Sequence, residues 1–83
     1  MLKIQRSTIG EVVFKLSGRM EAEHVPDLNS LLVSEKNAAL LVLDLTDLRL
    51  VDGDVVSFLH RCEADGIKLK NCPAYIREWI TRL

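Results

Sequence analysis

The sequence has almost no excess charge and no long hydrophobic run. Its 83 residues hold 11 Lys and Arg against 12 Asp and Glu, a formal net charge of −1. No basic run is present that would neutralise nucleic-acid phosphates. No segment approaches the roughly 20 apolar residues of a membrane-spanning helix, and the opening MLKIQRSTIG lacks the apolar core of a signal peptide. We therefore expect a cytoplasmic protein with no membrane span and no nucleic-acid partner.

Residues that carry chemistry are also scarce. Cys62 and Cys72 stand ten positions apart, which fits neither a CxxC redox pair nor a four-ligand zinc set. The isolated Gly18 indicates a turn rather than a phosphate-binding loop, and no Ser/His/Asp or Cys/His set has a recognisable local context. We expect no catalytic residues, no cofactor and no metal. Cys72 precedes a predicted helix, which could lower its thiol pKa, although a structural role is the simpler interpretation.

Hydrophobic residues make up 48% of the chain, which excludes disorder, and a chain of this length forms a single domain over residues 1–83. Residue patterns of period two predict strands, and patterns of period 3.6 predict helices. The predicted strands cover residues 2–6, 10–17, 40–43 and 67–70. Three helices are predicted. The first covers residues 20–36, the second begins at residue 53 and ends at Gly66, and the third begins at residues 71–73.

The stretch from Leu40 to Leu59 organises this prediction. Leu40 to Leu43 form an unbroken apolar run, typical of a strand buried on both faces. Asp44 interrupts the run, and a buried carboxylate without partners is costly. We therefore expect Asp44 at the exposed end of the strand, where with Thr46 it would organise the loop that carries residues 52–54. Because Asp44, Asp47, Asp52 and Asp54 share one short stretch, a magnesium or phosphoacceptor site is the alternative interpretation.

The helix that follows is the clearest in the sequence. Asp52 is a good N-cap, and the charge of Asp54 is favourable in the first turn. One helix face is apolar, and Gly66 suits the left-handed residue after a helix. That apolar face consists of Val55, Phe58, Leu59 and Cys62. The last predicted helix has a similar stripe, which would pack on the sheet or on another chain; it consists of Ile76, Trp79, Ile80 and Leu83.

Three short motifs, in this order and spacing, resemble the STAS domain of bacterial anti-sigma factor antagonists and sulfate-transporter tails. They are residues 14–19 (FKLSGR), 41–46 (LVLDLT) and 50–54 (LVDGD), followed by residues 66–73 (GIKLKNCP). The resemblance implies an α/β fold of the STAS type, a β-α superhelix with a four-stranded, mostly parallel sheet and three helices. Many relatives continue with another strand and helix, so the domain would be truncated after the third helix and could self-associate there.

The resemblance also implies a partner site, with one departure. In the antagonists the loop reads Asp-Ser-Ser-Gly, and a serine is phosphorylated to switch off partner binding. Here the loop reads Asp52-Gly53-Asp54-Val55, so Asp54 stands at the phosphoacceptor position and no hydroxyl remains. A carboxylate carries roughly one negative charge where phosphoserine carries about 1.5 to 2. We expect no serine switch at this loop.

The predicted function is a non-enzymatic protein-interaction module that binds an anti-sigma factor or another kinase of the ATP-binding type. The predicted partner-binding residues are Asp52, Gly53, Asp54, Val55 and Phe58. Two alternatives remain open. One is an aspartate-phosphorylated receiver using Asp52 with magnesium, for which Glu11 and Lys70 are poor partners. The other is a structural subunit that forms a homodimer through the apolar face of the last helix.

Overall fold

The structure is a computed structural model, which describes residues 2–8, 10–35 and 40–83. It confirms an α/β fold with a four-stranded mixed sheet and three α-helices. The strands are β1 (Leu2–Thr8), β2 (Val12–Met20), β3 (Leu41–Val51) and β4 (Lys68–Lys70). The helices are α1 (Val25–Ser34), α2 (Gly53–Ala64) and α3 (Ala74–Thr81), and a short 3₁₀ turn, η1 (Ala22–His24), precedes α1.

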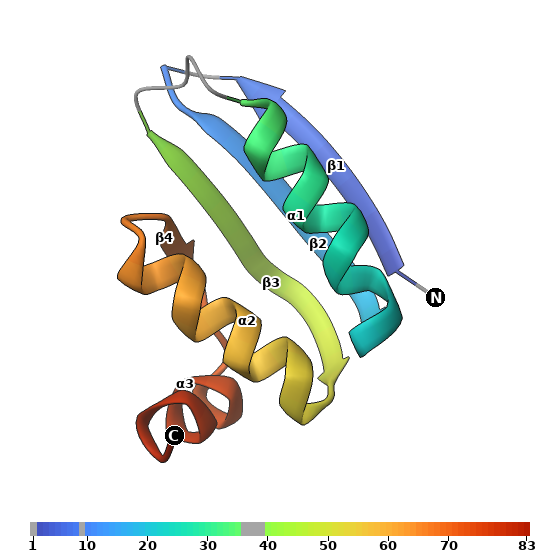
Figure 1. The fold of residues 1–83 in the computed structure, drawn as a ribbon, viewed down its shortest axis with the longest axis vertical. Helices are drawn as coiled ribbons and strands as arrows, with labels where there is room; N and C mark the ends of the chain where they lie inside the picture. The colour runs from blue at the N-terminus through green and yellow to red at the C-terminus, as the bar shows by residue number, and fades with distance from the viewer. Residues whose placement is uncertain (1, 9, 36–39) are drawn as a thin grey trace.

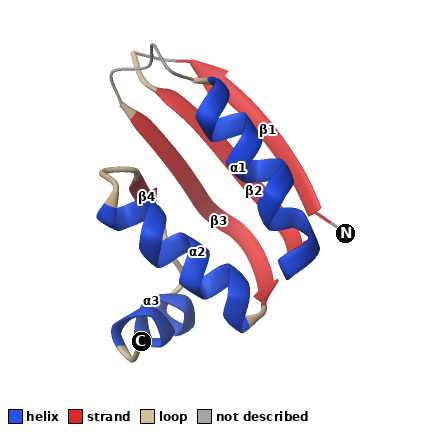
Figure 2. Cartoon of the chain, viewed as in Figure 1, coloured by secondary structure: helices blue, strands red, loops and turns tan. Residues whose placement is uncertain are grey.

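The sheet has the strand order β1-β2-β3-β4. β1 is antiparallel to β2, while β2, β3 and β4 are parallel to one another. The crossovers through α1 and α2 advance in the same direction across the sheet. Both helices therefore lie on one face, as Figures 1 and 2 show. The molecule thus has two layers, a sheet and a helical cover on one side.

The core lies between the sheet and the two helices. Along β2, the residues at alternate positions 12, 14 and 16 are buried toward the helices, while their neighbours are partly exposed on the other face. Val42 and Leu43 are adjacent in β3 and both have 0% exposure. Burial on both faces is thereby confirmed for this part of the strand. The face without helices is otherwise polar, with side chains such as Lys15 and Asp47, whose charged atoms lie 3.1 Å apart.

Several predicted boundaries were wrong. β2 does not end at residue 17 but runs on to Met20, so Gly18, predicted to form a turn, lies within the strand with a positive φ of +94°. β3 does not end at Asp44 but runs on to Val51, because it pairs with β2 as far as Met20 through two register shifts. The pairing supplies the backbone hydrogen bonds that the sequence pattern did not reveal. The first helix begins later than predicted, since residues 22–24 form the turn η1 and Pro26 lies in the first turn of α1. The predicted end of this helix at residue 36 lies outside the described residues.

Beyond the end of β4, helix α3 contacts the same edge of β3. β4 pairs only with residues 42–44 of β3, so the rest of that β3 edge lacks a neighbouring strand among the described residues. The Tyr75 hydroxyl of α3 donates a hydrogen bond of 2.5 Å to the Arg49 carbonyl on β3. Ile76 and Ile80 are buried in the common core. The predicted stripe of the last helix is therefore only half buried, since Trp79 and Leu83 remain exposed.

The part of the chain that the structure describes contains no helix with both the length and the apolar character needed to cross a bilayer.

Candidate functional site: the acidic turn at the start of α2

Asp52 holds the start of α2 in place with both oxygens of its carboxylate. Oδ1 accepts a hydrogen bond from the Val55 backbone N–H at 3.0 Å, which confirms Asp52 as the N-cap. Oδ2 accepts one from the Ala22 N–H at 2.9 Å, thirty residues earlier in the chain. These backbone donors lower the pKa of the Asp52 carboxyl. Asp52 is thus a positioning residue that ties the start of α2 to the turn after β2.

The turn lies at the carboxyl end of β3, the edge at which open parallel sheets meet their ligands. Gly53 and Asp54 are exposed there, in the first turn of α2. The indole ring of Trp79 borders the turn, because a Cβ atom added to Gly53 would lie 3.8 Å from its Cζ2 atom. The exposed Asp54 therefore directly follows the glycine that this aromatic ring of α3 borders.

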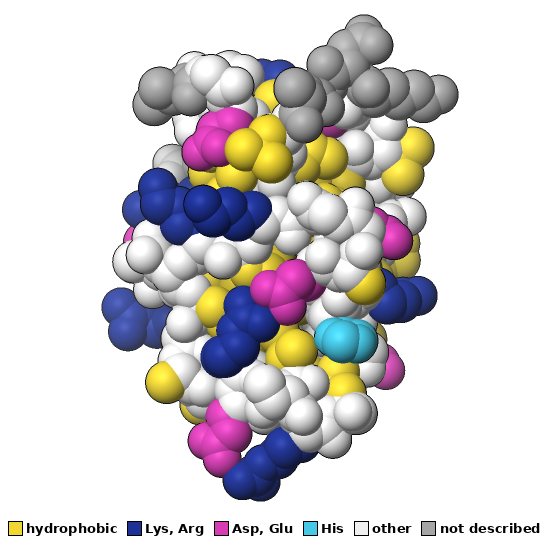
Figure 3. All heavy atoms as spheres, turned by 90° about the vertical axis from the view of Figure 1, so that its left-hand side faces the viewer, with side chains coloured by type: hydrophobic (Ala, Val, Ile, Leu, Met, Phe, Trp, Pro, Cys, Tyr) yellow, Lys and Arg dark blue, Asp and Glu magenta, His cyan; other side chains and the backbone are white. Residues whose placement is uncertain are grey.

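Exposed apolar side chains continue from this point over α3. Tyr75 is 46% exposed, Trp79 38% and Leu83 59%, and they line a shallow hollow of about 470 Å³ together with Glu78 and Arg82. Figure 3 views the molecule from the side on which α2 and α3 lie in Figure 1, and shows hydrophobic side chains between charged ones. We call Gly53, Asp54, Tyr75, Trp79 and Leu83 the turn–α3 surface. The helical spacing placed Trp79 and Leu83 on a stripe that would pack on the sheet or on another chain, and it did not predict that they lie beside the turn at residues 52–54.

Two predicted partner-binding residues do not belong to this surface. Val55 is 0% exposed and Phe58 4% exposed. Both side chains pack in the core, as their helical spacing in fact requires. They support α2 from beneath, and the structure contradicts their assignment as contact residues.

Asp44 and Thr46 do not organise the turn at residues 52–54. The Asp44 carboxylate accepts hydrogen bonds from the Thr46 backbone at 3.0 Å, from the Thr46 hydroxyl at 2.6 Å and from the Asn71 amide at 3.5 Å. Partial burial raises the pKa of the Asp44 carboxyl, but these hydrogen bonds outweigh it and the pKa lies below its ordinary value. Asp44 lies within β3, opposite Lys70 of β4. It was predicted to lie at the end of the strand, and because the strand continues to Val51, Asp44 is too far along the chain to organise the turn. Its shortest hydrogen bonds are to Thr46 within β3, and the longer one reaches Asn71, directly after β4.

The predicted alternative of a metal site finds no geometry to support it. Within residues 2–8, 10–35 and 40–83, no three His, Cys, Asp or Glu side chains converge as metal ligands would. Both Asp52 oxygens already accept hydrogen bonds from backbone N–H groups.

The thiol of Cys72 is not activated, since burial raises its pKa.

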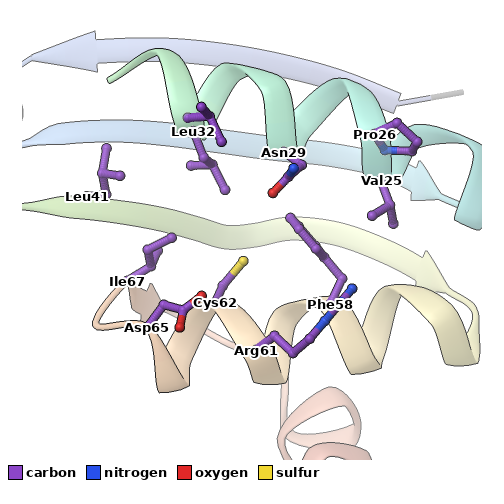
Figure 4. A pocket seen from close by; sticks show the side chains of 11 residues that line it. Val25, Pro26, Asn29, Leu32, Leu41, Phe58, Arg61, Cys62, Asp65 and Ile67 are labelled. Atoms are coloured by element: carbon purple, nitrogen blue, oxygen red, sulfur yellow. The ribbon is translucent and has the colours of Figure 1, made fainter. Parts of the chain in front are cut away.

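A second hollow lies between α1 and α2, above the sheet. It has a volume of about 520 Å³ and is lined mainly by apolar side chains. Figure 4 shows Phe58 and Cys62 of α2 facing Val25 and Leu32 of α1 across it. The Cys62 thiol is held neutral, because burial raises its pKa to about 11.

Comparisons with known proteins add no assignment: no protein-family model matches the chain, and no curated protein matches it.

Proposed function

We propose that this chain is a non-enzymatic protein-interaction module of the STAS, anti-sigma factor antagonist type, and that it binds its partner through the turn–α3 surface. The observation that carries the proposal is that the Trp79 ring borders Gly53, the residue directly before the exposed Asp54. Tryptophan and tyrosine supply much of the binding energy at protein interfaces, where they fill pockets of the partner. An acidic group beside them steers association toward a basic partner surface.

The proposed regulation follows from the charge of Asp54. It lies exposed in the first turn of α2, where a negative charge is favoured by the helix dipole. In this proposal the carboxylate is a permanent feature of the binding surface and no serine switch operates at the turn. The proposed partner is an anti-sigma factor or a related kinase of the ATP-binding type.

The test is calorimetric binding to a purified kinase of this type, with the wild-type chain and three variants. We expect Trp79→Ala to weaken binding about 10- to 30-fold and Asp54→Lys to weaken it by a similar factor. Asp27→Lys is the matched control, because Asp27 is an exposed acidic residue in the first turn of α1. Equal binding by all four chains would refute the proposed surface.

A phosphorylation assay separates the surface from its switch. Incubated with the kinase and ATP, the wild-type chain should gain no phosphoryl mass, whereas Asp54→Ser restores a hydroxyl and should be modified. Ser57 is exposed on α2, so Ser57→Ala is added to exclude a substitute acceptor. Phosphorylation of the wild-type chain that disappears in Ser57→Ala would show that a serine switch exists after all.

A further inference from the structure

β1 forms an open edge of the sheet. It has seven residues that pair one for one with β2 from Leu2 to Thr8, without a register shift. Within the described chain no other strand pairs with it. On its outer side, alternate backbone N–H and C=O groups are left for another extended chain to bond.

The usual protections of such an edge are weak here. The strand contains no proline and no bulge, and it is long enough for several backbone hydrogen bonds. Arg6 is not free to repel an approaching strand, because its guanidinium donates hydrogen bonds of 2.6 and 3.3 Å to the Glu35 carboxylate. Lys3 is the one remaining cation of the strand.

An exposed apolar side chain of α1, Leu31, belongs to the same side of the molecule. Leu31 lies four residues before Glu35, the C-cap of α1, whose carboxylate binds Arg6 of β1. From this spacing we infer that Leu31 lies on the flank of α1 nearer to β1. The opposite flank, with Asn29 and Val33, lines the hollow toward α2. Leu31 is 39% exposed, so part of its apolar surface remains for a partner to cover.

The residue order of β1 fits a second copy of itself. If two β1 strands pair antiparallel with Gln5 on the two-fold axis, all seven residues of each strand are used. Lys3 then lies opposite Ser7, Ile4 opposite Arg6, and Leu2 opposite Thr8, so no like charges oppose each other. The same symmetry brings α1 of both copies to one face of the joined sheet, with their Leu31 side chains on the adjoining flanks.

We propose that two copies of this chain associate through β1, forming one continuous sheet whose interface is completed by Leu31 of each copy. This interface is separate from the turn–α3 surface, so a dimer leaves both partner-binding surfaces accessible. The two proposals therefore stand or fall independently.

The test is sedimentation equilibrium over roughly 1 μM to 1 mM protein, with variants that act only on this interface. Gln5→Glu places two carboxylates opposite each other on the axis, while within each copy it faces Lys15 of β2 and keeps the strand pairing favourable. Leu31→Glu puts a charge on the α1 flank. We expect each to raise the dimer Kd about tenfold or more. Leu83→Glu is the matched control on α3, and we expect it to leave the dimer unchanged.

Every other outcome overturns the proposal. A wild-type chain that stays monomeric throughout, or a dimer that only Leu83→Glu weakens, would exclude pairing through β1. Circular dichroism checks that the variants fold. If Leu31→Glu does not fold, the result for Gln5→Glu decides alone. Amide hydrogen exchange gives an independent readout, since the outward amides of β1 should become protected with rising concentration in the wild-type chain and not in Gln5→Glu.

Discussion

The two edges of the sheet are treated in opposite ways. On one side β4 is only three residues long, and beyond it α3 approaches β3, where Tyr75 bonds the Arg49 carbonyl. On the other side β1 is long and regular, and among the described residues no strand pairs with its outer side. An edge that is covered within the chain needs no partner, whereas an open one offers backbone groups for association.

Helix α3 has apolar side chains on both its inner and its outer side. Ile76 and Ile80 face inward and complete the core, so the helix is bound to the sheet. Trp79 and Tyr75 are then left partly exposed, and the Trp79 ring borders Gly53 of the acidic turn. The element that covers one edge of the sheet thereby creates the surface that we propose binds a partner.

The largest expected effect comes from removing the inner anchor of α3. Ile76 is 0% exposed, so Ile76→Ala should reduce the free energy of unfolding by about 2–4 kcal/mol, through lost burial and the cavity left behind. Chemical denaturation measures it. Leu83→Ala, on the exposed side of the same helix, should stay within about 0.5 kcal/mol of the wild type. A similar small effect for both would mean that α3 does not complete the core.

A smaller effect is expected from the hydrogen bond between α3 and the β3 edge. Tyr75→Phe removes the hydroxyl that Arg49 accepts from and should cost about 1 kcal/mol, because the ring stays in place while the carbonyl loses a partner. Thermal and chemical unfolding measure the change. No loss of stability would show that water replaces the hydroxyl without cost, and that the helix covers the edge by packing alone.

The smallest effect concerns one ion pair near each edge. Arg77 of α3 bonds the Glu63 carboxylate of α2 at 2.8 and 3.0 Å and lowers its pKa below 4.5, and Arg6 lowers that of Glu35 in the same way. A lowered carboxyl pKa stabilises the fold above about pH 4.5, and this contribution disappears as the pH falls through the folded-state pKa. Glu63→Gln should therefore cost about 0.5 kcal/mol or less at neutral pH.

The difference between the wild type and each of Glu63→Gln and Glu35→Gln should vanish in acid. Urea unfolding at neutral pH and at about pH 3 measures both, and high salt should reduce the difference at neutral pH. A cost that persists unchanged in acid would mean that the carboxylate charge is not what stabilises these contacts.

Much of the fold was predictable because its signals are local. The N-cap at Asp52, the apolar face of α2 and the positive φ of Gly66, which is +90°, all agree with the prediction. Each depends on residues within a few positions, where backbone geometry and helical period act directly. The turn η1 is held by an equally local contact, since the His24 ring nitrogen accepts a hydrogen bond from the Glu21 N–H at 2.9 Å.

Several of the failures involve distant neighbours. The extension of β3 beyond Asp44 depends on pairing with β2, which a polar residue in the pattern concealed. Val55 and Phe58 were predicted both to lie on the apolar face of the helix and to contact a partner. Both are buried in the core, so they are not available for contact with a partner. The hydrogen bond from the Ala22 N–H to the Asp52 carboxylate joins residues thirty positions apart, and nothing in the sequence near either residue predicts it.

The sequence by itself determined the order of strands and helices, the capped start of α2 and the acidic character of the turn, because these follow from local periodicity and side-chain chemistry. Only the tertiary structure decided that β3 continues to Val51, that Trp79 stands beside Gly53 and that β1 is left as an open edge. These features arise from which strands pair and how far each pairing extends, and such long-range contacts are set by the whole chain as it packs.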